Sequence, residues 1–237
     1  MMKYGVAPDV FQMYPDYVRG VVVVAGLVNG AVENREIGAL LRDAERLVIE
    51  NPDLANIAEH PRIASWRTAY AKFGARPSKF FSSIEALVRR VRKGDQLPYI
   101  NDLAAICNVF SLRYLVPVGG HDIGVVQHDL LLAAATGNEV FAPIGTSAAE
   151  NPDPGEIVYL AGNTVLCRRW TWRQAEFTKL VPESNYVAIN VDGMPPVSPE
   201  LVARICTEMA EMVVRFCGGV ADCRYLTAET PLIDLAL

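Results

Sequence analysis

The pattern of apolar residues changes near residue 115, and this change limits the folds open to the chain more than any other feature. Before that point apolar residues recur at helical spacing, as in residues 35–51. After it, short strand-like segments are separated by Gly, Pro and Asn. Helical spacing predicts amphipathic helices, and short segments bounded by turn residues predict antiparallel hairpins. The sequence therefore predicts an α+β fold, a single domain over residues 1–237 in which β-sheet and helices form a layered sandwich.

Capping residues mark the ends of several predicted helices. Ser82 and Glu85 have the spacing of a capping box, and Gly94 stands where a C-terminal cap belongs. Ser198 precedes Pro199 at the start of a helix that is expected to run to Cys217. Further helices are expected over residues 35–51 and 61–74.

Several segments are expected to form strands. The run of valines in residues 19–25 indicates a buried strand, and residues 161–163 (Ala-Gly-Asn) are expected to turn one hairpin. Residues 185–193 and 221–227 read as further strands.

Composition narrows the class of protein. Half of the 237 residues are apolar, but no apolar run approaches the roughly 20 residues that span a bilayer. The N-terminal segment lacks the charged start and apolar stretch of a signal peptide. The five cysteines form no C-x-x-C pair, and the three histidines have no ligand spacing. We therefore expect a cytoplasmic protein with no membrane partner, metal or cofactor.

Positive charge is concentrated in two segments although the net charge is −5. Residues 60–95 carry nine Lys or Arg against two acids, and residues 167–173 carry three arginines interleaved with two tryptophans. An acidic chain with two basic patches favours a specific contact with a polyanion over general nucleic-acid coating. The candidate RNA-binding residues are Arg89, Arg90, Arg92, Arg168, Arg169 and Arg173; the alternative is that these arginines are solvated surface charges.

The stretch from residue 98 to residue 122 places polar residues at positions that core packing does not explain. Asn101 follows Pro-Tyr-Ile, Asn108 falls inside an apolar helical run, and His121 with Asp122 closes a glycine turn. A buried polar group without a partner costs about 1–3 kcal/mol. The amides are therefore expected to satisfy buried backbone groups and to fix a turn that presents side chains into a cleft.

The motifs that follow one another from this stretch onward resemble a known module. "LPYIN", Asn108, the Pro117 turn ending at Asp122, "GNEVFAPIG" and "GEIVYLAGNTVLCRRWTWR" occur in the order seen in the editing, tRNA-binding domain (B3/B4 type) of the bacterial phenylalanyl-tRNA synthetase β subunit. The chain is most similar to free-standing versions of that domain, over about residues 15–230. The resemblance implies the same fold and a pocket that hydrolyses an aromatic amino acid wrongly esterified to a tRNA.

The resemblance also implies site residues. Candidate catalytic residues are Asn108, His121 and Glu176, the last aligned with a glutamate that reads the tyrosine hydroxyl in the synthetase. The candidate substrate-binding residues are Cys107, Leu160, Ala161, Trp170 and Trp172. Trp170 and Trp172 alternate with Thr171, so a strand through them would present both rings on one face. The alternatives are a core role for the cysteine and the tryptophans, and an exposed strand end for Glu176.

Three positions depart from the synthetase pattern. Ala105 stands where the synthetase has an acidic residue, Cys107 replaces a threonine, and Gly119 replaces a pocket histidine. Hydrolysis of an activated ester needs only a positioned water and a polarised carbonyl, so a trans-acting aminoacyl-tRNA deacylase is the first hypothesis. A non-catalytic tRNA- or RNA-binding module, and an amino-acid or small-molecule binding protein, are the alternatives.

Overall fold

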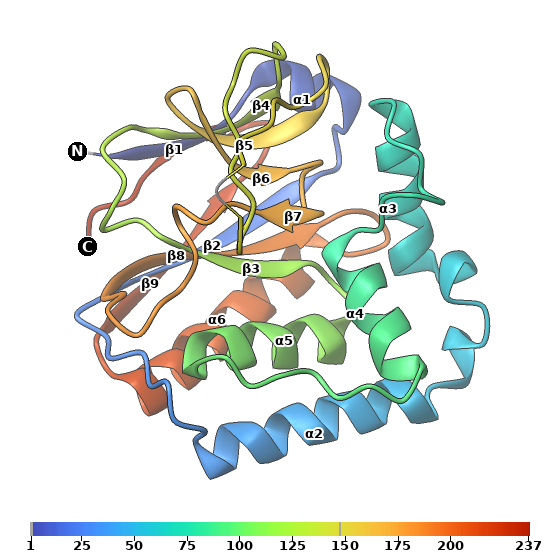
Figure 1. Cartoon of the computed structure of the whole chain (residues 1–237), viewed down its shortest axis with the longest axis vertical. Coiled ribbons are helices and arrows are strands. Elements are labelled where there is room, and N and C mark those ends of the chain that lie inside the picture. The colour runs from blue at the N-terminus through green and yellow to red at the C-terminus, as the bar shows by residue number, and fades with distance from the viewer. Residues whose placement is uncertain (1, 147) are drawn as a thin grey trace.

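The fold consists of two β-sheets that face each other, with helices covering the outer face of the smaller sheet (Figure 1). A computed structural model describes residues 2–146 and 148–237. Helices α5 (Asp102–Tyr114) and α6 (Pro199–Cys217) pack on the smaller sheet, and α2 (Arg35–Glu50) packs beneath α5. The predicted α+β class and the layered sandwich are confirmed.

The larger sheet has six strands in the order β10–β1–β4–β5–β6–β7. Their bounds are Leu232–Asp234, Lys3–Val6, Leu130–Ala134, Ile157–Ala161, Thr164–Arg168 and Arg173–Gln174. Most neighbours are antiparallel, as expected, but β1 and β4 are parallel. Gly162 and Asn163 connect β5 to β6 where the sequence predicts a hairpin turn.

The smaller sheet has four strands in the order β3–β8–β2–β9. Their bounds are Val118–Asp122, Tyr186–Gly193, Val18–Ala25 and Val220–Leu226. All three pairings are antiparallel. The central strand β2 comes from the front of the chain, so the division into a helical first half and a strand-rich second half is only approximate.

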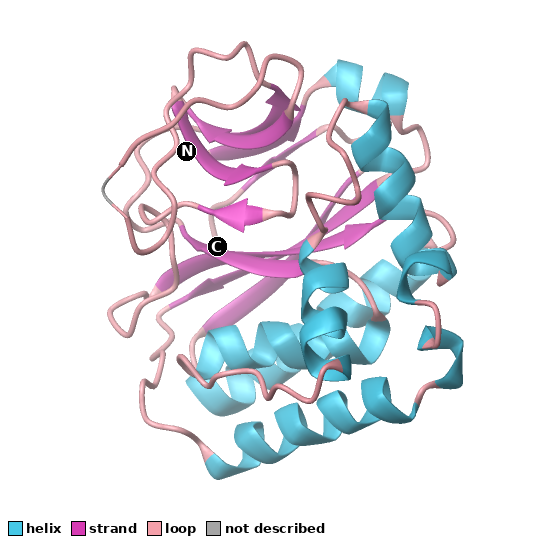
Figure 2. Ribbon diagram, turned by 45° about the vertical axis from the view of Figure 1, so that its right-hand side comes forward, coloured by secondary structure: helices cyan, strands magenta, loops and turns pink. Residues whose placement is uncertain are grey.

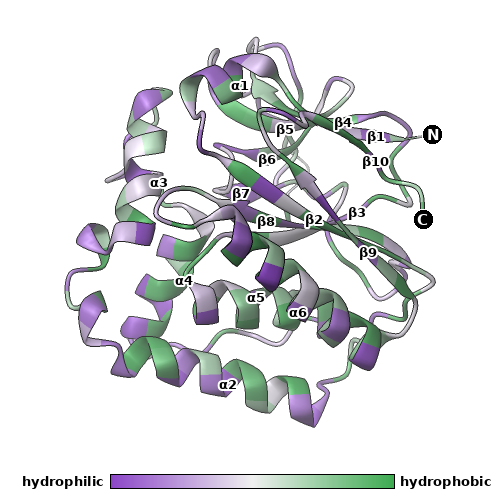
Figure 3. Cartoon of the chain, turned by 180° about the vertical axis from the view of Figure 1, so that it is seen from behind, coloured by the Kyte–Doolittle hydropathy of each residue, from purple (hydrophilic) through white to green (hydrophobic). Residues whose placement is uncertain are grey.

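The remaining helices lie beside the two sheets (Figure 2). They are α1 (Pro8–Met13), α3 (Pro61–Lys72), α4 (Ser83–Arg92) and two short 3-10 turns, Pro52–Leu54 and Ile57–Glu59. Helix α2 carries alternating hydrophilic and hydrophobic residues along its length (Figure 3). In the described part of the chain, no helix has the length and apolar character needed to cross a membrane.

The predicted helix caps form, with one difference. The Ser198 side chain accepts from Leu201 N, and the Ser82 Oγ atom accepts from Glu85 N at 3.4 Å. The Glu85 carboxylate does not complete the capping box, because its Oε1 atom accepts hydrogen bonds from Arg67 and Arg89 instead. Only the serine half of the predicted box is present.

Asn101 does what the sequence predicts of a buried amide. Its Oδ1 atom accepts from Ala104 N at 2.8 Å, which caps α5, and its Nδ2 atom donates to the Leu180 carbonyl at 2.9 Å. The segment after α5 differs from the prediction, because residues 118–122 form strand β3 rather than a glycine turn. Residues 187–191 of the neighbouring strand pair with this segment, and the Asp122 amide donates to the Thr178 carbonyl, so the segment is held extended.

Candidate functional site

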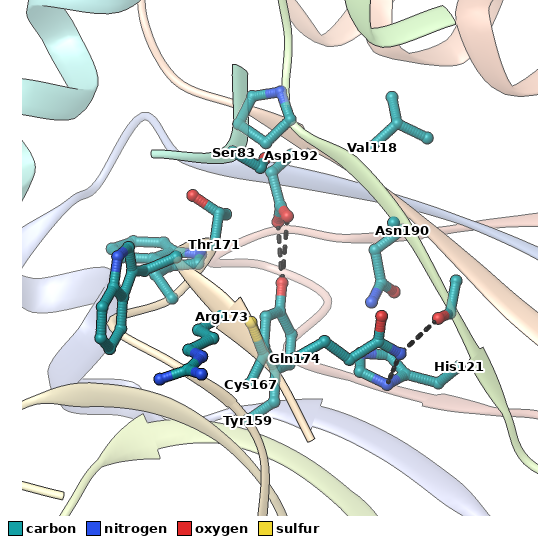
Figure 4. Close-up of a pocket in the computed structure, with 15 residues that line it drawn as sticks. Ser83, Val118, His121, Tyr159, Cys167, Thr171, Arg173, Gln174, Asn190 and Asp192 are labelled. Carbon is teal, nitrogen blue, oxygen red and sulfur yellow. Dashed lines mark hydrogen bonds between the residues drawn. The ribbon is translucent and has the colours of Figure 1, made fainter. Parts of the chain in front are cut away.

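A cavity of about 210 Å³ lies between the two sheets. Its walls come from β3 and β8 of the smaller sheet, from β5, β6 and β7 of the larger sheet, from residues 170–172 and from Ser83 at the start of α4 (Figure 4). This volume exceeds the roughly 150 Å³ of a dry cavity that binds benzene and is below the roughly 300 Å³ of drug-sized pockets. The cavity therefore has room for one aromatic ring and a few further atoms.

Strand alternation places polar side chains on the cavity face of the smaller sheet. Asn190 and Asp192 are two residues apart on β8, so both point to the same side. Gly119 is directly opposite Asn190, and Arg19 is directly opposite Asp192. The other face packs on α6, where a Cβ atom on Gly20 would lie 2.2 Å from Cys206 Sγ.

A buried ion pair supports the floor of the cavity, with Asp192 on the cavity wall and Arg19 behind it. Arg19 is completely buried, and its Nε and NH2 atoms donate to Asp192 Oδ1 at 3.0 and 2.9 Å. Tyr17 also donates to this oxygen, while Tyr159 donates to Asp192 Oδ2 at 3.0 Å. Arg19 donates in turn to the hydroxyls of Tyr4 and Tyr159. The ion pair is thus compensated by hydrogen bonds, as buried charges require.

Asn190 has no such compensation. It is 3% exposed, and its Oδ1 atom has no hydrogen-bond partner among the described residues. A buried acceptor without a partner costs about 1–3 kcal/mol unless water or a ligand satisfies it. Since Asn190 lines the cavity, its amide is available to whatever the cavity binds.

His121 lines the cavity in an uncharged form. Burial, with a further contribution from the positive charge of Arg19, lowers the pKa of His121 to about 4. Its Nδ1 atom lies 2.8 Å from Thr178 Oγ1 and 3.4 Å from Gln174 Nε2. The Nε2 atom makes no hydrogen bond within the described chain, so the tautomer that donates from Nδ1 can orient a water with Nε2.

The turn after β6 holds one wall of the cavity in a strained conformation. Arg169 and Trp170 have φ angles of +45° and +63°, a region that residues other than glycine rarely adopt. Glu156 stabilises this turn, because its carboxylate accepts from Arg168 Nε at 2.9 Å, from Arg168 NH2 at 2.7 Å and from Arg169 N at 2.9 Å. The predicted strand through residues 170–172 is therefore wrong: β6 ends at Arg168.

The two tryptophans consequently have different surroundings. Trp170 is fully buried, with Trp66 and Tyr17 ring centroids at 5.2 and 4.8 Å. Trp172 is half-buried, and the Arg169 guanidinium lies 4.6 Å from its ring centroid and 3.7 Å from that of Phe80. Both tryptophans line the cavity.

The structure brings some of the predicted site residues together and leaves others apart. Those on the cavity wall are His121, Trp170, Trp172 and Arg173. Those outside it are Asn108, Glu176, Cys107, Leu160 and Ala161. Asn108 and Cys107 lie on α5. Leu160 packs against a separate apolar cluster on the larger sheet, and Ala161 is in the main core.

Glu176 and Cys107 lie outside the cavity in other surroundings. The Glu176 side chain is 41% exposed and pairs with Lys179, and Lys179 together with the Gly145 amide lowers the pKa of Glu176. Burial raises the pKa of Cys107 to about 12, so its thiol is not a nucleophile at neutral pH. Their positions give neither residue access to the cavity.

The candidate RNA-binding arginines also divide. Arg168 and Arg169 are 5% exposed and pair with Glu156 and Asp153, so they brace the turn. Arg89 pairs with Glu85 at 2.8 Å. The exposed members of the set are Arg90, Arg92 and Arg173.

Sequence reasoning missed the floor of the cavity, namely Arg19, Tyr159, Asn190 and Asp192, and also Gln174. One signal was present in residues 187–192 (Val-Ala-Ile-Asn-Val-Asp), where polar residues occupy alternate positions of an otherwise apolar strand. Such alternation marks a face that contacts something other than the core. Arg19, at the start of the valine run, gave a similar indication.

Comparisons with known proteins place these features in a family. The B3/4 domain family matches residues 65–218. A crystal structure of an N-terminal fragment of the phenylalanyl-tRNA synthetase β-subunit from Pyrococcus horikoshii aligns with 93% of this chain at 12% identity and a TM-score of 0.46. The chain spans about half of that fragment, since 49% of the fragment is covered. No curated protein sequence matches the chain. The family match spans well over half of the residues, and the chain belongs to the B3/4 domain family.

Proposed function

We propose that the cavity binds the aminoacyl end of a tRNA charged with an aromatic amino acid and hydrolyses the ester. The observation that carries this proposal is the cavity itself. Its volume suits one aromatic ring, and the Asn190 amide on its wall has an acceptor without a partner in the described chain. Membership of the B3/4 domain family and the resemblance to the synthetase editing domain support the same reading.

Five residues on the wall have distinct parts in this proposal. The rings of Tyr159 and Trp172 contact the substrate ring, and Asn190 forms a hydrogen bond with a ring hydroxyl. A site that hydrogen-bonds a hydroxyl rejects the analogue that lacks it, because the site's own polar group is then left unpaired. Neutral His121 orients the attacking water through Nε2, and Arg173 contacts a phosphate of the tRNA end.

The test is release of labelled amino acid from tRNA charged with tyrosine or with phenylalanine, measured under single-turnover conditions. We expect release of tyrosine well above the spontaneous rate, with phenylalanine released about tenfold or more slowly. Asn190→Ala removes this difference, whereas Glu176→Ala, outside the cavity, leaves it within about twofold. If the purified protein releases neither amino acid faster than buffer alone, the proposed hydrolase activity is wrong.

Gly119 offers a gain-of-function variant. A Cβ atom at Gly119 meets nothing within 4 Å, and the residue is in extended strand β3, so a side chain fits there. The resemblance places a synthetase histidine at this position. We expect Gly119→His to fold and to accelerate release, and Gly119→Ala to serve as its control.

The second candidate is a protein that binds a free aromatic amino acid without acting on tRNA. The commitment of Arg168 and Arg169 to carboxylates favours it, because it removes two cations from the expected RNA surface. Isothermal titration with free tyrosine and with uncharged tRNA separates the two functions: the second candidate binds only the amino acid.

A further inference from the structure

Asp192 uses its two carboxylate oxygens unequally. Oδ1 accepts from Arg19 twice and from Tyr17, whereas in the described chain the donor near Oδ2 is the Tyr159 hydroxyl, whose single proton lies between Oδ1 at 3.1 Å and Oδ2 at 3.0 Å. A carboxylate oxygen has two lone pairs, so one remains on Oδ2 within the described chain. Asp192 lines the cavity, and Figure 4 shows its carboxylate directed toward Tyr159 at the centre of the site.

The charges around this oxygen are arranged as a buried dipole. Arg19 does not line the cavity and is completely buried, whereas Asp192 and Tyr159 form the wall in front of it. The negative end of the ion pair therefore faces the cavity. Since low dielectric strengthens such interactions, this wall favours a donor that carries positive charge.

We propose that Asp192 Oδ2 receives the α-ammonium group of the ligand, so that the cavity selects amino acid derivatives with a free amino group. This rests on the proposed function only in that it concerns the same cavity and an aromatic amino acid. Asn190 lies two residues from Asp192 on β8, about 7 Å along the strand. The two acceptors therefore serve the two polar ends of a tyrosine-like ligand.

The inference predicts which group, on the protein or on the ligand, makes binding depend on pH. Among the groups around Asp192, burial lowers the pKa of His121 to about 4 and raises the pKa of Cys167 to about 12. Burial also raises the pKa of Tyr4, Tyr17 and Tyr159, and the charge of Asp192 raises the pKa of Arg19 despite the burial of that guanidinium. Between pH 6 and pH 9 the group left to titrate is the ligand amine, with an ordinary pKa of about 7.7–8.0.

The experiment measures equilibrium binding to the wild-type chain, so no variant has to fold. The probes are L-tyrosine amide and 3-(4-hydroxyphenyl)propionamide, which differ only in the amino group and contain no ester. At pH 6 we expect the compound without the amine to bind about tenfold or more weakly. The smaller size of this compound excludes a steric explanation.

A pH series completes the test. The affinity for tyrosine amide is expected to fall above the pKa of its amine and to approach that of the compound without the amine, whose own affinity stays constant with pH. Equal affinities at pH 6, an affinity for tyrosine amide that does not change with pH, or no binding of tyrosine amide overturns the inference. Binding as expected without release of amino acid from charged tRNA would instead overturn the hydrolase and leave this inference standing.

Discussion

Two arginine–carboxylate pairs are buried beside the cavity, and they differ in what their carboxylates leave unused. Glu156 accepts hydrogen bonds at both oxygens from Arg168, and further ones from the amides of Arg169 and Asp153. Asp192 accepts from Arg19 and Tyr17 at Oδ1, has only the Tyr159 hydroxyl near Oδ2 among the described residues, and lines the cavity. The same pair of residue types therefore stabilises a turn in one place and places a carboxylate on the cavity wall in the other.

The largest effect is expected where the floor pair is broken. Asp192→Ala leaves the buried guanidinium of Arg19 unpaired and should lower the free energy of unfolding by about 3–5 kcal/mol. Urea unfolding measures it. Glu36→Ala is the control, because the Arg215–Glu36 pair is exposed and is worth about 0–1 kcal/mol. A loss at Asp192 no greater than that of the control would show that the floor is not held by this pair.

The positive charge of Arg19 should also influence, through its neighbour His121, how the stability of the protein changes with pH. Burial and Arg19 lower the pKa of His121 from 6.5 to about 4, so between these values the unfolded chain binds a proton that the folded chain does not. Stability is therefore full above pH 6.5 and falls as the pH drops toward 4, by about 3 kcal/mol in all.

Comparing variants isolates this contribution from that of the carboxylates. His121→Gln should flatten the stability profile between pH 6.5 and pH 4, and His128→Gln, at an exposed position, should reproduce the wild-type profile. Unfolding in urea at several pH values provides the data. Parallel profiles for wild type and His121→Gln would mean that His121 titrates normally in the folded protein.

Weakening the Glu156–Arg168 pair should lower the free energy of unfolding less than breaking the Arg19–Asp192 pair. Glu156→Gln keeps one acceptor but places an amide against Arg168, which retains Glu150 at 3.0 Å. We expect a loss of about 2 kcal/mol in the free energy of unfolding. The turn at Arg169 should loosen as well, so acrylamide should quench tryptophan fluorescence more strongly. A loss as large as that of Asp192→Ala, with unchanged quenching, would contradict the distinction between the Glu156–Arg168 pair and the Arg19–Asp192 pair.

The same contrast explains how far the sequence could predict the structure. Local signals placed the helices that begin at residues 35, 61, 83 and 199 and the hairpin turn within residues 161–163 correctly, and the Asn101 amide satisfies buried backbone groups as expected. These depend on residues close together in the chain. The floor depends on the register that sets Arg19 against Asp192, 173 residues away, and no local pattern fixes that register.

The strand prediction for residues 170–172, on the cavity wall, was wrong for a different reason. Alternating Trp170, Thr171 and Trp172 have the pattern of a strand, but Glu156 holds Arg169 and Trp170 in left-handed backbone conformations. Tertiary contacts therefore override the local pattern. Alignment by motif points to Glu176, which lies outside the cavity, whereas the polar side chains on its wall that lack a partner among the described residues are Asn190 and Trp170.

The smallest effect on stability is expected for exposed arginines that belong to neither of the two buried arginine–carboxylate pairs. Arg90 is exposed on α4, so Arg90→Gln should change the free energy of unfolding by no more than about 0.5 kcal/mol. If tRNA contacts α4, this variant should weaken binding and reduce the slope of log K against log salt concentration by about 1, because one phosphate contact is lost. Arg215→Gln removes the same charge from α6 and should leave the slope unchanged. Filter binding at several salt concentrations measures both slopes, and equal slopes for Arg90→Gln and wild type would assign the basic face of α4 to solvent rather than to RNA.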